Sequence, residues 1–121
     1  MIIMPVIAVV DDDAGVRGSI DSLLRSAGMA PLVFSRGEDL LTSDVWATIG
    51  CVLTDLHMPG ISGIELQQEM TKRGWQCPVI VMTAFPTSAS RDRALAAGAI
   101  AFLTKPVDPD CLLNAIGKAI A

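Results

Sequence analysis

The rest of the chain is organised around one stretch, Cys51-Val52-Leu53-Thr54-Asp55-Leu56-His57-Met58-Pro59-Gly60-Ile61-Ser62-Gly63. Its apolar start is short enough for a buried strand, ends on a single acid, and passes through a Pro-Gly loop into a helix start. Asp55 therefore lies at the carboxyl end of a predicted strand. Ligands bind at that edge of an open α/β sheet, so Asp55 is a candidate for chemistry. The alternative is an Asp that only caps a turn, where Asp is common.

The same alternation of strand and helix continues along the whole chain. Strand patterns occupy residues 6–10, 31–34, 50–54, 78–82 and 100–104. Helices are predicted from about residue 16 to 27, 35 to 45, 62 to 74 and 89 to 97, and from 108 to the chain end. Five strands alternating with five helices predict an α/β fold with a parallel sheet covered by helices on both faces.

Several helix starts carry a recognisable cap. The patterns Ser35-x-x-Glu38 and Ser62-x-x-Glu65 both match a capping box. Asp108 followed by Pro109 predicts the start of the last helix. Asp13 is expected to cap the first helix. Each cap fixes where a strand's exit loop ends.

Length and composition limit the function classes. We expect 121 residues to form one domain, 1–121, with a real core. The longest apolar run, residues 1–10, is shorter than the roughly 20 residues of a membrane span and lacks signal-peptide features, so a cytoplasmic protein without a membrane segment is expected. A net charge of −4 argues against nucleic-acid binding by this domain. Three scattered cysteines, Cys51, Cys77 and Cys111, are interpreted as core residues and not as a disulfide or zinc site.

Functional side chains gather at the predicted carboxyl ends of four strands, namely Asp11 and Asp12, Asp55, Thr83, and Lys105. Three carboxylates at one edge repel one another unless a cation compensates them. Magnesium suits such oxygen ligands and leaves positions for a phosphoryl oxygen. Lys105 and the Thr83 hydroxyl could bind other phosphoryl oxygens, and a carboxylate beside the metal could act as nucleophile. These parts match phosphoryl transfer.

Four motifs carry a family resemblance: Val9-Val10-Asp11-Asp12-Asp13, Thr54-Asp55-Leu56-His57-Met58-Pro59 with Ser62-Gly63, Thr83-Ala84, and Phe102-Leu103-Thr104-Lys105-Pro106. Together, in this order and spacing, they resemble the receiver domain of two-component response regulators over nearly the whole chain. The resemblance implies a flavodoxin-like, doubly wound parallel sheet with strand order 2-1-3-4-5.

The resemblance also assigns roles to residues. Asp55 would accept a phosphoryl group from a histidine of a sensor kinase, and Asp12, Asp55 and the His57 carbonyl would bind Mg²⁺ directly, with Asp11 holding a metal-bound water. Thr83 and Lys105 would contact the phosphoryl group, Phe102 would change rotamer with Thr83, and the Lys105-Pro106 bond would be cis.

For some of these residues a plainer interpretation stays open. Lys105 could be a loop cation, Phe102 an ordinary core residue, and His57 a catalytic side chain instead of a carbonyl donor. Phe85 lies two residues after Thr83. We hypothesise that its bulky side chain restricts the access of water to the phosphoryl group.

The resemblance implies a switch at the face formed by the fourth helix, fifth strand and fifth helix, used for homodimerisation or output. The residues of these motifs are similar to those of receivers in FixJ and LuxR type transcriptional regulators. The chain is therefore expected to be either a stand-alone receiver or one cut before a DNA-binding domain. The main rival is a receiver-like interaction module that works unphosphorylated. Two further alternatives are less favoured. A haloacid-dehalogenase-like phosphatase would use Asp11 and Asp13 but would leave the segment 55–59 without a role. A flavin-binding module would need a phosphate-binding loop that this sequence lacks.

Overall fold

A computed structural model describes residues 4–121. The five strands are β1 (Val6–Val10), β2 (Ala30–Phe34), β3 (Cys51–Asp55), β4 (Val79–Thr83) and β5 (Ala101–Thr104). The helices are α1 (Ala14–Ser26), α2 (Gly37–Thr42), α3 (Gly63–Lys72), α4 (Ser88–Ala96) and α5 (Pro109–Ile120), with a 3-10 turn, η1 (Trp46–Thr48). Residues 1–3 of the apolar run at the start lie outside the described residues.

The strands form one parallel sheet in the order β2-β1-β3-β4-β5. This confirms the flavodoxin-like order 2-1-3-4-5 expected from the sequence. β1 pairs with β3 so that Val10 lies beside Thr54. Because neighbouring parallel strands end at the same edge, Asp11 and Asp55 leave the sheet side by side.

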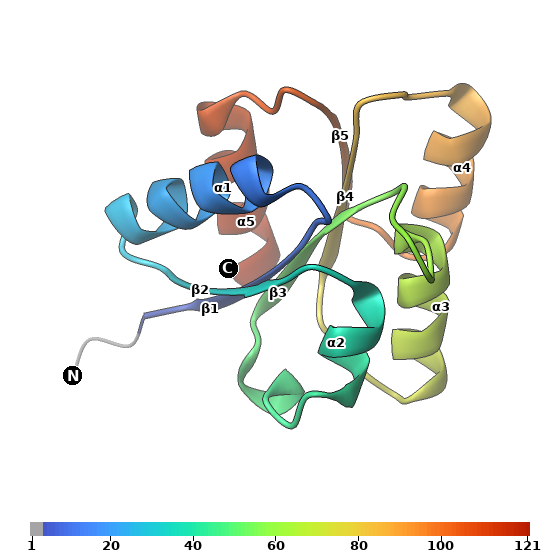
Figure 1. The fold of residues 1–121 in the computed structure, drawn as a ribbon, viewed down its shortest axis with the longest axis horizontal. Helices are drawn as coiled ribbons and strands as arrows, with labels where there is room; N and C mark the ends of the chain where they lie inside the picture. Colours follow the sequence, from blue (N-terminus) through green and yellow to red (C-terminus); the bar gives the residue numbers. More distant parts are fainter. Residues whose placement is uncertain (1–3) are drawn as a thin grey trace.

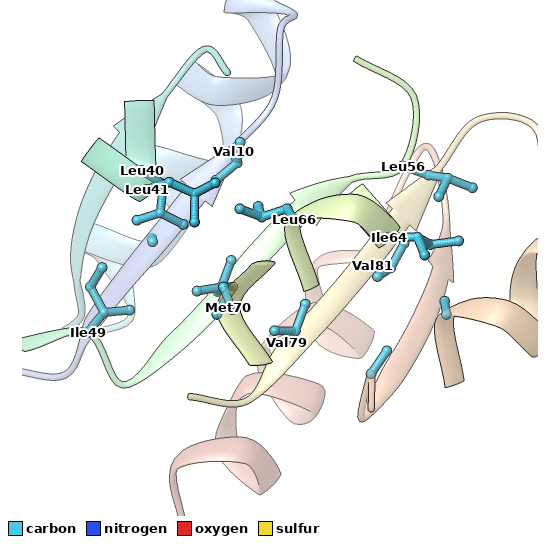
Figure 2. Close-up of a cluster of buried hydrophobic side chains, with 14 residues drawn as sticks. Val10, Leu40, Leu41, Ile49, Leu56, Ile64, Leu66, Met70, Val79 and Val81 are labelled. Carbon is cyan, nitrogen blue, oxygen red and sulfur yellow. The ribbon is translucent and has the colours of Figure 1, made fainter. Parts of the chain in front are cut away.

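Helices cover both faces of the sheet, with α1 and α5 on one side and α2, α3 and α4 on the other (Figure 1). Each face buries its own apolar cluster, because successive side chains of a strand point to opposite faces. Ile7, Leu53 and Ile80 pack toward α1 and α5, where they meet Leu24 and Leu112. On the other side, Figure 2 shows Leu40 of α2 and Leu66 and Met70 of α3 over the strands, where they belong to the same cluster as Val81 of β4.

The second helix differs from its prediction at both ends. The helix begins after Arg36, which makes no side-chain cap, so the capping box predicted at Ser35 and Glu38 is absent. It ends at Thr42 and not near Val45, because Ser43 has extended backbone angles and turns its hydroxyl back to the Leu40 carbonyl at 2.7 Å. A local pattern has here been overridden by tertiary contacts of Glu38, which are described below.

The other predicted caps are confirmed. Ser62 and Glu65 form both halves of a capping box at the start of α3. The Asp13 carboxylate accepts from the Val16 amide at 3.0 Å, and the Asp108 carboxylate accepts from the Cys111 amide at 3.0 Å. The remaining boundaries agree with the predicted ranges to within one or two residues.

One prediction about the cysteines is wrong. Cys51 is buried and Cys77 is partly buried, but Cys111 is exposed on the first turn of α5. Burial raises the pKa of Cys51 to about 12 and that of Cys77 to about 11, so both remain neutral thiols at physiological pH.

Within residues 4–121, no helix is long and apolar enough to cross a membrane.

Candidate functional site

Three acids meet at the carboxyl edge of the sheet. Asp11 and Asp12 follow β1, and Asp55 is the last residue of β3. Each offers a carboxylate oxygen, and these oxygens all lie within 4.8 Å of one another. Asp11 is fully buried and Asp55 is 7% exposed, whereas Asp12 faces solvent. The sheet register therefore brings together the acids that the sequence places 44 positions apart, from Asp11 to Asp55.

Lys105 supplies the cation of this cluster. Its ammonium lies 2.5 Å from Asp11 Oδ2 and 3.3 Å from Asp55 Oδ1. The side chain is only 15% exposed, so both ion pairs are largely shielded from water. The Lys105-Pro106 bond is cis, as expected from the sequence. These contacts make Lys105 part of the acid cluster.

The charges of the cluster shift two pKa values. Burial, reinforced by the neighbouring charge of Asp11, raises the pKa of Asp55 despite the opposing effect of Lys105. For Lys105, burial by itself lowers the pKa, but the hydrogen bond and charge of Asp11, helped by Asp55, raise it above its usual value. The ammonium is thus held charged while the carboxylates remain crowded.

Backbone contacts fix the loop that carries Asp11 and Asp12. The Asp13 amide donates to Asp11 Oδ1 at 2.9 Å. The Arg17 guanidinium, on the first turns of α1, donates to the Asp11 carbonyl at 2.7 Å. Sequence reasoning missed Arg17, because a single cation on a helix surface carries no signal of the carbonyl it meets after folding.

Thr83 and Phe102 are not drawn into the acid cluster in this structure. Thr83 is fully buried, and its hydroxyl accepts from the Phe85 amide at 3.0 Å. Its carbonyl accepts from the Lys105 amide at 2.8 Å, which joins the ends of β4 and β5. Phe102 is partly buried against the cluster beneath α2 and α3. The Phe85 side chain is 75% exposed.

The donor set fits a divalent cation. Three carboxylates face one ammonium, so the cluster retains negative charge that an additional cation could balance. Hard ions such as Mg²⁺ prefer oxygen ligands of this kind. His57 lies two residues after Asp55 in the same loop, and its side chain is exposed.

Comparison with known proteins places this geometry in a family. The sequence model described as the response regulator receiver domain matches residues 7–117. The chain belongs to the response regulator receiver family. The four motifs named above lie within the matched residues, and so does the acidic pocket of Asp11, Asp12 and Asp55.

Relatives of this receiver domain include transcriptional regulators. It is 38% identical over 113 residues to the transcriptional regulatory protein TdiR of Thauera aromatica, which covers 93% of this chain and 50% of TdiR. It is 39% identical over 112 residues to the transcriptional regulatory protein FixJ of Azorhizobium caulinodans, covering 93% of this chain and 53% of FixJ. The chain thus spans about half the length of the curated relatives it matches.

Solved structures agree with the assignment. The response regulator StyR has a TM-score of 0.87 and 39% identity, with 98% of this chain and 60% of StyR covered. A receiver protein from Pseudoalteromonas atlantica has a TM-score of 0.89 and 26% identity, with 96% and 97% covered.

Proposed function

We propose that residues 1–121 act as a single phospho-acceptor receiver domain in which Asp55 takes a phosphoryl group from a histidine of a sensor kinase. A carboxylate oxygen of Asp55 attacks the phosphorus, the phosphorus–nitrogen bond breaks, and the imidazole leaves with the bonding electron pair. The product is an acyl phosphate. The observation that carries this proposal is the Asp55 carboxylate, held 3.3 Å from the Lys105 ammonium among two other acids.

The surrounding residues have distinct roles in this step. Asp12, Asp55 and the His57 carbonyl would hold Mg²⁺ directly, and Asp11 would hold one of its waters. When bound, Mg²⁺ neutralises charge on the carboxylates and on the incoming phosphoryl oxygens. The Lys105 ammonium, already beside Asp55, is placed to pair with a phosphoryl oxygen, and the Thr83 hydroxyl would donate to another.

A groove beside the cluster offers a route for the kinase histidine. It has a volume of about 490 Å³ and lies between α1 and the segment that joins β5 to α5. Asp13 and Val16 line one side, and Lys105 and Pro106 line the other. A partner helix that contacts α1 could thus bring its phosphohistidine to Asp55.

Phosphorylation would then act as a switch. A phosphoryl group adds about −1.5 to −2 charge. Moving the Thr83 hydroxyl toward it would release the Phe85 amide and let Phe102 change rotamer. We expect the face of α4, β5 and α5 to shift between two packings and to support homodimerisation or contact with an output domain. We expect the domain to serve a cytoplasmic transcriptional regulator, with no direct contact of its own to nucleic acid or membrane.

Intact-mass measurement after incubation with Mg²⁺ and acetyl phosphate tests the proposal. The wild type should gain one phosphoryl group, and Asp55→Asn should gain none. Asp21→Asn is the matched control, because Asp21 lies on α1, away from the acid cluster, and within residues 4–121 its ion-pair partner is Arg25. Loss of uptake without Mg²⁺ would support the metal's part in the reaction.

Two outcomes would contradict the proposal. Uptake by Asp55→Asn would move the acceptor elsewhere. No uptake by the wild type, while Mg²⁺ still binds, would favour the interaction module that works unphosphorylated.

A further inference from the structure

The loop between Asp55 and α3 carries the His57 carbonyl but has few bonds of its own. Its ends are fixed, because the Leu56 amide donates to Met82 and the Gly63 amide donates back to the Leu56 carbonyl. In the described part of the chain, one hydrogen bond alone connects the backbone of residues 57–61 to another element. The side chains of Met58 and Ile61 pack on the core, and this bond is the polar contact that fixes the loop's backbone.

The contact comes from Glu38 in the first turn of α2. Its Oε2 atom accepts from the Ile61 amide at 3.3 Å, across 23 positions of sequence. Its Oε1 atom is buried and has no hydrogen-bond partner within residues 4–121. The Glu38 side chain is 41% exposed and its Oε2 atom also lies 3.9 Å from Arg36 Nη2, but the Oε1 atom is buried against the loop.

Gly60 forms a cradle for the same carboxylate. Its φ of +79° favours glycine. A Cβ atom at Gly60 would lie 2.2 Å from Glu38 Oε2 and 2.8 Å from Oε1, so the close approach needs a residue without a side chain. The loop has both the backbone conformation and the space that this carboxylate requires.

The neighbouring residue of α2 packs on the same loop. A Cβ atom at Gly37 would meet the side chain of Ile61 at 2.9 Å, and Gly37 is buried. Two successive residues of α2 thus contact Ile61. Glu38 accepts a hydrogen bond from the Ile61 amide, and Gly37 lies against the Ile61 side chain. α2 and α3 cover the same face of the sheet, so this contact fixes the loop between Asp55 and α3 from the α2 side (Figure 1).

We propose that Glu38 is a positioning residue that lets α2 fix the loop carrying the His57 carbonyl, and so tunes metal binding and phosphorylation at Asp55. This inference rests on the proposed function. Outer contacts that orient a metal ligand commonly affect metal affinity although they never touch the metal. Glu38 would act in that way, through Gly60 and Ile61.

Three variants test the contact. Glu38→Ala removes the acceptor, whereas Glu38→Gln keeps an oxygen for the Ile61 amide. Asp39→Ala is the matched control, because Asp39 is the exposed acid next to Glu38 on α2. Amide hydrogen exchange should show Ile61 exchanging about tenfold faster in Glu38→Ala, the effect of losing one hydrogen bond to a charged group. Glu38→Gln should restore most of the protection, and Asp39→Ala should match the wild type.

Mg²⁺ titration without phosphodonor, followed by the amide shifts of residues 55–61, gives the second readout. Glu38→Ala should need several-fold more Mg²⁺ for half-saturation. With acetyl phosphate, its phosphorylation should be slow at low Mg²⁺ and approach the wild-type rate at saturating Mg²⁺. A purely structural defect would lower the rate at every Mg²⁺ concentration.

A double-mutant cycle probes the cradle directly. Gly60→Ala should destabilise the protein through both its positive φ and its clash with Glu38. In the Glu38→Ala background the clash with the carboxylate is removed and only the flexible end of the Arg36 side chain, at 2.9 Å, remains close, so the same substitution should destabilise less. Equal effects in the two backgrounds would count against the contact.

The inference is overturned if Glu38→Ala has the exchange rates and Mg²⁺ affinity of Asp39→Ala. That result leaves the proposed function intact, provided that the wild type accepts a phosphoryl group at Asp55. Failure of the wild type to accept one would instead remove the proposed function, and the exchange and Mg²⁺ measurements would still decide the role of Glu38.

Discussion

At the scale of single residues, the site is a balance of like charges against one buried cation. Asp11 and Asp55 share the Lys105 ammonium, which is 2.5 Å from one and 3.3 Å from the other. One ammonium cannot fully compensate two buried carboxylates and the exposed Asp12 beside them. The pKa of Asp55 is therefore raised by burial and by Asp11, and the folded state is stabilised when Asp55 loses its charge.

This balance predicts a pH-dependent effect of Asp55→Asn on stability in metal-free buffer. The folded pKa of Asp55 is raised above 3.8, so the native state binds the proton more tightly than the unfolded chain. The contribution of Asp55 to the free energy of unfolding is fully present below pH 3.8, and it is lost as the pH rises through the pKa of Asp55 in the folded state. Asp55→Asn should thus raise the free energy of unfolding at pH 7, and the gain should shrink toward pH 4.

Urea denaturation at several pH values measures this difference. Asp21→Asn should change stability by no more than about 0.5 kcal/mol at each pH, because it loses a single i,i+4 ion pair on a helix. A stabilisation of Asp55→Asn that grew as the pH fell would contradict the expected sign. Adding Mg²⁺ should stabilise the wild type more than the variant, because the variant lacks one proposed ligand.

At the scale of elements, two similar sequence patterns form different structures, because one makes a capping box and the other does not. Ser62 and Glu65 cap α3, with Ser62 Oγ accepting from the Glu65 amide at 3.1 Å and Glu65 Oε1 accepting from the Ser62 amide at 2.9 Å. At Ser35-x-x-Glu38 the helix starts one residue later and the carboxylate binds Ile61 instead. A capping pattern states only what a helix start can do; contacts from elsewhere in the fold decide whether it does so.

The two serines therefore provide a matched pair of substitutions. Ser62→Ala should lower the free energy of unfolding by about 1 kcal/mol, because it removes a helix cap. Ser35→Ala should change it by less than about 0.5 kcal/mol, because Ser35 is exposed and makes no cap. Thermal or urea unfolding of both variants measures the difference, and equal losses would show that Ser35 caps α2 after all.

At the scale of the whole molecule, two helices on the same face of the sheet, α3 and α4, differ in how firmly they are held. α3 buries five residues, whereas Ala94 is the buried residue of α4. One side-chain bond joins these helices, from Gln67 Nε2 to the Ala94 carbonyl at 3.2 Å. Loosely packed elements supply the moving parts of proteins. α4 is thus suited to shift when the site at the end of β4 changes.

Thr83→Ala should separate phosphorylation from this shift. The variant keeps Asp55 and Lys105, so uptake from acetyl phosphate should stay within about tenfold of the wild type, since one hydrogen bond to the phosphoryl group is lost. The change in amide exchange over α4 and β5 that phosphorylation causes in the wild type should be absent. Thr104→Ala is the control, because Thr104 lies opposite Thr83 in the sheet but is exposed. A wild-type response in Thr83→Ala would assign the coupling to another residue.

The strand order was predicted from the resemblance to receiver domains, whereas the sequence pattern alone predicted the order and type of the elements and the acids and lysine at the strand ends. It could do so because period, caps and strand-end residues are local, and because parallel strands bring their carboxyl ends to one edge. Strand-end position was enough to predict the residues that meet at this edge, namely Asp11, Asp12, Asp55 and Lys105.

Only the tertiary structure decided which partners these local signals meet. Glu38 turns from its own helix start to Ile61, Arg17 finds the Asp11 carbonyl, and Cys111 faces solvent. The Thr83 hydroxyl accepts a hydrogen bond from the Phe85 amide. Such contacts join groups whose distance depends on how every intervening element packs, so no local pattern in the sequence encodes them.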